Sequence, residues 1–90
     1  MEYLYVTDNT EYKGEYFYII KQENKNRKTP IYHIFNFDTN FLGDIRWFAK
    51  WRRYCFFPYN NTVWDIKCLR DVQEQLERIN IEYKSGGVGN

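Results

Sequence analysis

The stretch FLGDIRWFAKWRRYCFFP, residues 41–58, predicts a β-hairpin and decides the fold. In its first half, Ile45 and Trp47 share one side of a strand, and the other side carries Asp44, Arg46 and Phe48. A tight connection at residues 49–51 leads into a second strand at residues 52–58. Pro58 should end that strand as an edge or final strand, because proline has no backbone N–H to give to a neighbour.

Three further runs rich in β-branched and aromatic residues predict strands at residues 2–6, 15–22 and 31–37. The segments between these runs are polar and predict turns or loops at residues 7–10, 23–30 and 38–40. Within the third run, one face should carry Ile31, His33, Phe35 and Phe37.

The segment TVWDIKCLRDVQEQLERIN, residues 62–80, predicts an amphipathic helix. Its apolar row at helical spacing is Leu69, Val72, Leu76 and Ile79, with Cys68 beside it. Asp65 is the expected N-cap, because its carboxylate can accept a bond from an unpaired N–H of the first turn. The opposite face offers the oppositely charged pairs Arg70–Glu74 and Glu74–Arg78.

These elements predict an α+β fold, with an antiparallel sheet of four or five strands in a meander and one C-terminal helix packed on one face. We expect a single domain over residues 1–83, followed by a flexible tail at residues 84–90. Both sheet faces carry large aromatic side chains, so the pattern does not decide which of them the helix covers. The uncovered face would then be an aromatic surface of the kind that marks an interaction site.

Charge is nearly balanced over the whole chain but uneven along it. The formal net charge of +1 argues against a strongly basic nucleic-acid binder and against an acidic mimic of DNA. Residues 21–53, however, hold eight basic and three acidic residues, a local balance of +5. The basic residues of this segment are Lys21, Lys25, Arg27, Lys28, Arg46, Lys50, Arg52 and Arg53.

The sequence favours a cytoplasmic protein without a membrane segment. The opening MEYLYVTDNTEY is acidic and lacks the apolar core of a secretory leader, and no apolar run approaches the ~20 residues of a membrane-spanning helix. Two cysteines fall short of a secreted disulfide framework, so both thiols are expected to be reduced.

No pattern of residues predicts catalysis, a metal site or a cofactor. His33 alternates with Phe35 in a strand and is expected to be a half-buried structural residue. Cys55 and Cys68 are expected to be small buried apolar residues that approach each other across the core, and two thiols with one imidazole do not close a zinc site. The glycines near the C-terminus precede no helix, so they form no phosphate-binding loop.

Residues 46–64 hold all three tryptophans and three arginines and allow two interpretations. In the first interpretation, the aromatic side chains of this segment pack within the protein and its cations bind a partner protein. Alternatively, they can stack on the bases of single-stranded nucleic acid. Residues for that alternative are Trp47, Trp51, Tyr54, Phe56, Arg46, Arg52 and Arg53. The partner-binding surface we expect combines Arg46, Phe48, Lys50, Arg52 and Arg53 with Lys25, Arg27 and Lys28 of the charged loop.

Residues 32–79 resemble an uncharacterised family of small phage and prophage proteins. Its pattern is G-x-I-x-W, then W-R-x-Y-x-F-F-P, then T-V-W or T-V-F, then C-L-x-D. The matching positions are Gly43, Ile45, Trp47, Trp51, Arg52, Tyr54, Phe56, Phe57, Pro58, Thr62, Val63, Trp64, Cys68, Leu69, Asp71 and Val72. Members of the family often carry proline at the position of Lys50.

The resemblance implies a viral setting and no catalytic activity. We therefore expect a non-enzymatic protein, in the cytoplasm of a host cell, that binds a host protein or nucleoprotein complex stoichiometrically, as inhibitors of the host-takeover or anti-defence type do. The alternative is a module that binds single-stranded nucleic acid. Self-association, with a second copy covering the free aromatic face, is compatible with the first expectation.

Overall fold

The computed structural model describes residues 9–23 and 25–87 of the chain. Five antiparallel strands form one sheet in the order of the sequence: β1 (Thr10–Lys13), β2 (Tyr18–Gln22), β3 (Ile31–Phe35), β4 (Phe41–Phe48) and β5 (Arg53–Pro58). The helix α1 (Ile66–Glu82) follows, and the π-helical turn η2 (Tyr83–Gly87) continues it. The predicted α+β meander with a C-terminal helix is confirmed.

The N-terminal part of the sheet differs from the prediction. The expected strand at residues 2–6 lies outside the described residues, and the expected strand at residues 15–22 begins only at Tyr18. In its place, residues 14–17 form a turn in which the Gly14 N–H donates to the Phe17 carbonyl over 2.9 Å. The sequence did not predict β1, because this strand is short, polar and broken by a bulge at Glu11.

The hairpin of β4 and β5 has the predicted alternation. Trp47 pairs with Tyr54 and Ile45 pairs with Phe56, so these four residues share one face of the sheet. Pro58 is the last residue of β5, and β5 is an edge strand, as predicted. Arg52 ends the connecting turn in the left-handed conformation, with a φ of 57°.

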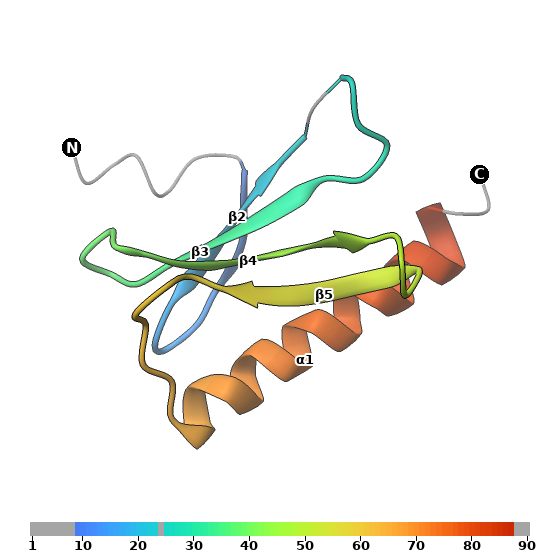
Figure 1. Cartoon of the computed structure of the whole chain (residues 1–90). Coiled ribbons are helices and arrows are strands. Elements are labelled where there is room, and N and C mark those ends of the chain that lie inside the picture. The colour runs from blue at the N-terminus through green and yellow to red at the C-terminus, as the bar shows by residue number, and fades with distance from the viewer. Residues whose placement is uncertain (1–8, 24, 88–90) are drawn as a thin grey trace.

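The helix covers one face of the sheet, as Figure 1 shows. Isoleucines of three neighbouring strands and one phenylalanine form the centre of this layer and are fully buried: Phe17, Ile19, Ile34 and Ile45. From the helix, Val72 and Ile79 pack against them. Burying such side chains contributes roughly 1.5–3 kcal/mol each, so this contact dominates the stability of the fold.

Aromatic side chains frame this core, as the composition suggested. Tyr32 and Tyr54 meet edge to face with ring centroids 5.8 Å apart. Trp64, just before the helix, packs against Phe17 at 6.5 Å and Phe56 at 5.0 Å. Trp64 therefore holds the N-terminal end of α1 onto the sheet.

The helix begins as predicted, but its buried row is turned relative to the prediction. Asp65 is the N-cap, and its Oδ1 accepts a 2.9 Å bond from the Cys68 N–H. Of the predicted row, Val72 and Ile79 are buried and Leu76 packs against the core, whereas Leu69 is 45% exposed and Gln75 is buried in addition. The tail expected at residues 84–90 begins with η2, and residues 88–90 lie outside the described part.

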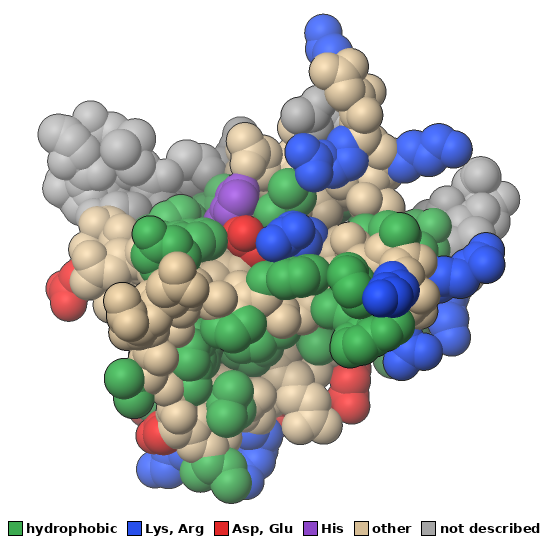
Figure 2. Space-filling model, in the orientation of Figure 1, with side chains coloured by type: hydrophobic (Ala, Val, Ile, Leu, Met, Phe, Trp, Pro, Cys, Tyr) green, Lys and Arg blue, Asp and Glu red, His purple; other side chains and the backbone are tan. Residues whose placement is uncertain are grey.

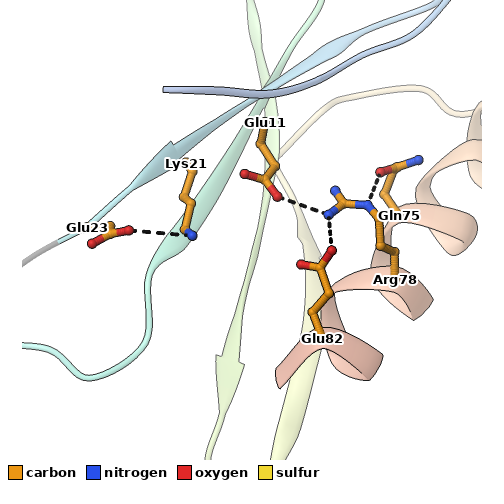
Figure 3. Close-up of polar contacts among 6 residues, drawn as sticks. All are labelled: Glu11, Lys21, Glu23, Gln75, Arg78 and Glu82. Carbon is orange, nitrogen blue, oxygen red and sulfur yellow. Dashed lines mark hydrogen bonds and ion pairs between the residues drawn. The ribbon is translucent and has the colours of Figure 1, made fainter. Parts of the chain in front are cut away.

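Polar contacts fix the helix to the β1 edge of the sheet. Arg78 Nη1 lies 3.0 Å from Glu11 Oε2 and 3.3 Å from Glu82 Oε2, and Arg78 Nε donates to Gln75 Oε1 (Figure 3). Arg78 is thus turned toward the sheet, and its expected pairing with Glu74 on the solvent face is wrong, because Glu11 of β1 lies within reach.

Candidate binding surface

The sheet face turned away from α1, hereafter the open face, brings together residues of four strands. One row of the register crosses it from Ile20 through His33 and Asp44 to Phe57. Side chains two positions along each strand share this face, so Arg46 and Phe48 lie on it beside the row. The helix therefore covers the face of Ile45 and Trp47 and leaves the face of Arg46 free.

Aromatic rings on the open face form two groups. In the first, Phe35 lies 5.8 Å from Phe41, which lies 5.1 Å from Tyr59. In the second, Phe48 contacts Phe57 at 6.0 Å and Trp51 at 5.0 Å. Both groups end in well-exposed rings, since Tyr59 is 55% and Trp51 is 62% exposed.

A polar chain separates the two aromatic groups. The His33 ring lies between two partners, with Nδ1 2.6 Å from Asp44 Oδ1 and Nε2 2.6 Å from Gln22 Oε1. The other oxygen of Asp44 lies 3.8 Å from Arg46 Nε. The Arg46 guanidinium lies 3.8 Å above the centre of the Phe57 ring. Figure 2 shows the histidine beside a red and a blue side chain, with green side chains on both sides.

The row of polar contacts from Gln22 to Arg46 supports the Arg46 side chain on the open face. An Asp44 oxygen lies near Nε of the guanidinium, and the Phe57 ring lies beneath its central carbon. A cation in this position and the ring attract each other. His33 is part-buried, as predicted, and both of its ring nitrogens are engaged. Within residues 9–23 and 25–87, no group of three His, Cys, Asp or Glu side chains could hold a metal ion.

The predicted cations gather at one end of the sheet, hereafter the basic end. The loop between β2 and β3 carries Lys25, Arg27 and Lys28, the turn between β4 and β5 carries Lys50 and Arg52, and Arg53 is the first residue of β5. Both connections lie at the same end because Gln22 pairs with Ile31 and Phe48 pairs with Arg53. Figure 2 shows blue side chains over this end.

Tyr83 joins the two halves of the basic end. It lines one hollow with Lys28 and Lys21, and a second hollow with Arg52 and Arg53. The Tyr83 ring packs 4.8 Å from Trp47, which places η2 beside the β4–β5 turn (Figure 1). Lys84 of η2 also lines the second hollow.

Most cations of the basic end have no acidic partner among the described residues. In that part of the chain, no ion pair involves Lys25, Arg27, Lys28, Lys50, Arg52 or Arg53. Arg53 is held only by a 3.3 Å bond from its Nε to the Trp51 carbonyl. The basic end is therefore free to bind acidic groups of another molecule.

Several residues expected at a nucleic-acid surface face the helix instead. Tyr54 is only 3% exposed, and Trp47 and Phe56 pack against the core. Of the four aromatic residues proposed to stack on bases, only Trp51 is available. The expected approach of the two cysteines is also wrong, because Cys55 lies opposite Arg46 on the open face and Cys68 lies on the helix at the other side of the sheet.

Burial favours the protonated, uncharged forms of the titratable groups nearest the core. Burial raises the pKa of Tyr54 to about 12 and raises the pKa of Tyr32 still further. Burial, with the nearby Asp65 carboxylate, also raises the pKa of the Cys68 thiol. A raised pKa keeps the thiol protonated at neutral pH, whereas a reactive cysteine needs the thiolate.

Sequence reasoning missed the residues that support Arg46 and the residues that border the basic end. Phe57 and Tyr59 were not assigned to the surface, although Phe57 follows from the alternation of β5 once the turn fixes Phe48 opposite Arg53. Tyr83 and Lys84 come from the chain after the predicted helix, where no periodic signal placed them. The predicted residues Arg46 and Phe48 do lie on the open face.

No family model, no curated protein and no solved structure matches this chain. In the described part, no helix combines the length and the apolar character needed to cross a membrane.

Proposed function

We propose that this protein is a non-enzymatic binding protein that acts stoichiometrically on a host protein or nucleoprotein complex. The setting is the one that the phage resemblance implies, a viral or mobile-element protein in the cytoplasm of its host. Host takeover and evasion of defence are the roles that fit a small inhibitor of this kind.

One observation carries the proposal: the unpaired basic end adjoins the second aromatic group of the open face. Arg52 and Lys50 sit in the turn that begins directly after Phe48, and the exposed Trp51 lies between them in the sequence. Tryptophan and arginine are the side chains that most often dominate the energy of protein interfaces. A matching partner surface is acidic and offers an apolar pocket for Trp51.

The test is a pull-down from bacterial host lysate with two matched charge reversals. Arg52→Glu with Arg53→Glu changes the basic end, whereas Lys13→Glu with Lys67→Glu makes the same change in charge at exposed positions elsewhere. We expect one protein to be captured after nuclease treatment by the wild type and by the control pair, and to be lost with the first pair. Equal capture by both pairs contradicts the proposed surface.

Arg52→Gly provides a second variant that the fold should accept. Arg52 has a φ of 57°, a conformation that glycine adopts without strain. Loss of binding in this variant therefore reports the missing guanidinium and not a distorted turn. Circular dichroism of the purified variant checks that the fold is kept.

Single-stranded nucleic acid is the second candidate, and the Arg46–Phe57 stack is the observation that favours it. A guanidinium that lies 3.8 Å above a ring can take up a base on its other side, and the exposed Trp51 ring offers another surface for stacking. If this candidate is right, binding to a labelled oligonucleotide should weaken steeply as salt is raised, because counterions are released on binding. No binding at low salt eliminates it.

A further inference from the structure

The outward side of α1 carries apolar residues where a surface helix is normally polar. Ile66 is 68% exposed, Leu69 is 45% exposed and Ile81 is 64% exposed. Ile66 and Ile81 lie on the side of the helix away from its buried row of Val72, Gln75 and Ile79, whereas Leu69 lies on the flank beside that row. None of the three is buried in the core, and Ile81 also lines a hollow with Trp51 and Arg53.

The outward residues are arranged about the middle of the helix. Gln73 and Glu74 are exposed and lie at the middle of this side, with Ile66 at one end and Ile81 at the other. A helix turns once in 3.6 residues, so residues 66, 70, 73, 77 and 81 all lie on this side. Ile66 and Ile81 are placed symmetrically about the point between Gln73 and Glu74, as are Arg70 and Glu77.

Such a stripe is complementary to itself when a second helix runs in the opposite direction. In an antiparallel pair with its two-fold axis between Gln73 and Glu74, Ile66 meets Ile81 of the second copy. Arg70 meets Glu77 of the second copy, and the symmetry repeats both contacts. In this arrangement the apolar ends of the two stripes contact each other, and each arginine near the centre contacts a glutamate of the other copy.

We propose that two copies of this chain associate through α1, with the helices antiparallel and the side chains of Ile66, Arg70, Gln73, Glu77 and Ile81 forming the interface. The two copies are not expected to associate by pairing their β5 edge strands. The side chain of Asn80 already bonds the backbone N–H and carbonyl of Tyr54, and Pro58 has no N–H. The β5 edge therefore has few free hydrogen-bonding groups for another strand. The contact is helix to helix.

The first measurement is sedimentation equilibrium of the full chain over a range of concentrations. We expect a dimer that dissociates on dilution. Ile66→Glu and Ile81→Glu should each raise the dissociation constant roughly 10- to 100-fold, because each places a charge in the apolar part of the interface twice. Phe37→Glu and Tyr59→Glu, at exposed positions of the sheet side, serve as controls and should leave the dissociation constant unchanged.

Charge exchange tests the antiparallel register itself. Arg70→Glu alone sets two acids against each other at both symmetric contacts, and Glu77→Arg alone sets two cations against each other. Each single variant should dissociate roughly tenfold more readily than the wild type. A mixture of the two variants restores both opposite-charge contacts and should form a heterodimer as stable as the wild-type dimer.

Three results would overturn the proposal. One is a wild-type chain that stays monomeric at millimolar concentration. Another is a dimer that survives Ile66→Glu and Ile81→Glu but is lost with the Phe37 and Tyr59 variants, which would place the contact on the open face. The last is a mixture of charge variants that associates no better than either alone. Ile81 and Glu77 share a hollow with Trp51 and Arg53, whereas Ile66 and Arg70 do not line it. The Ile66 and Arg70 variants therefore test the dimer separately from binding at the basic end.

Discussion

The side chain of Asn80 binds both backbone hydrogen-bonding groups of Tyr54. The Tyr54 N–H donates to Asn80 Oδ1 over 2.8 Å, and Asn80 Nδ2 donates to the Tyr54 carbonyl over 3.2 Å. Tyr54 lies in β5, the edge strand beside the helix, so the amide takes the place of a neighbouring strand. One residue thus fixes the C-terminal half of α1 to the sheet and blocks the sheet edge.

Asn80→Ala should destabilise the fold by about 1–3 kcal/mol, because a partly buried N–H and carbonyl lose their partners. Asn80→Asp keeps the acceptor and loses the donor, so its free energy of unfolding should lie between those of the wild type and the alanine variant. Urea denaturation followed by circular dichroism gives the three values. An alanine variant with the wild-type midpoint would show that water replaces the amide at no cost.

Gly43→Ala should destabilise the hairpin by about 1–3 kcal/mol. Gly43 has a φ of 156°, and a Cβ there would lie 2.7 Å from the Phe57 carbonyl oxygen, a backbone atom that cannot turn away. Gly14→Ala is the comparison, because its Cβ would meet only the end of the Tyr12 side chain. Thermal unfolding of both variants should show the larger loss at Gly43, and the reverse order would contradict this account.

The fold was predictable wherever one periodic pattern dominated. Alternation on both sides of the 49–51 connection, ended by Pro58, predicts the β4–β5 hairpin, and the Asp65 cap with its following apolar row predicts the helix. The pattern misassigned Leu69, because α1 has apolar residues both on its buried side and on its outward side. The strand β1 escaped prediction because a bulged strand with a polar sequence has no alternation to detect.

The candidate surface was predictable in part. Two hairpin connections at the same end of a meander must bring their cations together, so the basic end follows from the sequence once the topology is known. The hairpin register was not predictable, and it decides which side chains share a face. For that reason Tyr54 and Phe56 were grouped with Arg46, although Phe57 is the residue on which Arg46 lies.

The cap at Asp65 predicts a dependence of stability on acid pH. The backbone N–H of Cys68 lowers the pKa of the Asp65 carboxyl below its ordinary value of 3.8. A lowered pKa in the folded state means that the contribution is present above pH 3.8 and is lost as the pH falls through the lower folded value. Asp65→Asn keeps a capping oxygen but should remove this part of the acid dependence, whereas Asp65→Ala should lower the unfolding midpoint at neutral pH as well. Midpoints of thermal unfolding between pH 2 and 7 test both, and an unchanged acid profile in Asp65→Asn would contradict the assignment.

Buried tyrosines predict a loss of stability in alkali. Burial, together with a 2.8 Å bond to Asp71, raises the pKa of Tyr12 to about 12, and burial raises the pKa of Tyr54 to about 12 from the ordinary 10.0. Because the unfolded chain releases these protons first, the stabilisation is complete below pH 10 and is lost as the pH rises toward 12.

Urea denaturation from pH 8 to 11.5 should therefore show a falling midpoint above pH 10, together with a late tyrosinate absorbance in the folded protein. Tyr54→Phe removes a hydroxyl whose ionisation the core opposes, so it should reduce this alkaline fall. Tyr59→Phe, at a 55% exposed position, is the matched control for losing a hydroxyl without opening the core. If Tyr54→Phe and the wild type lose stability in parallel up to pH 11.5, ionisation of Tyr54 does not contribute to alkaline unfolding.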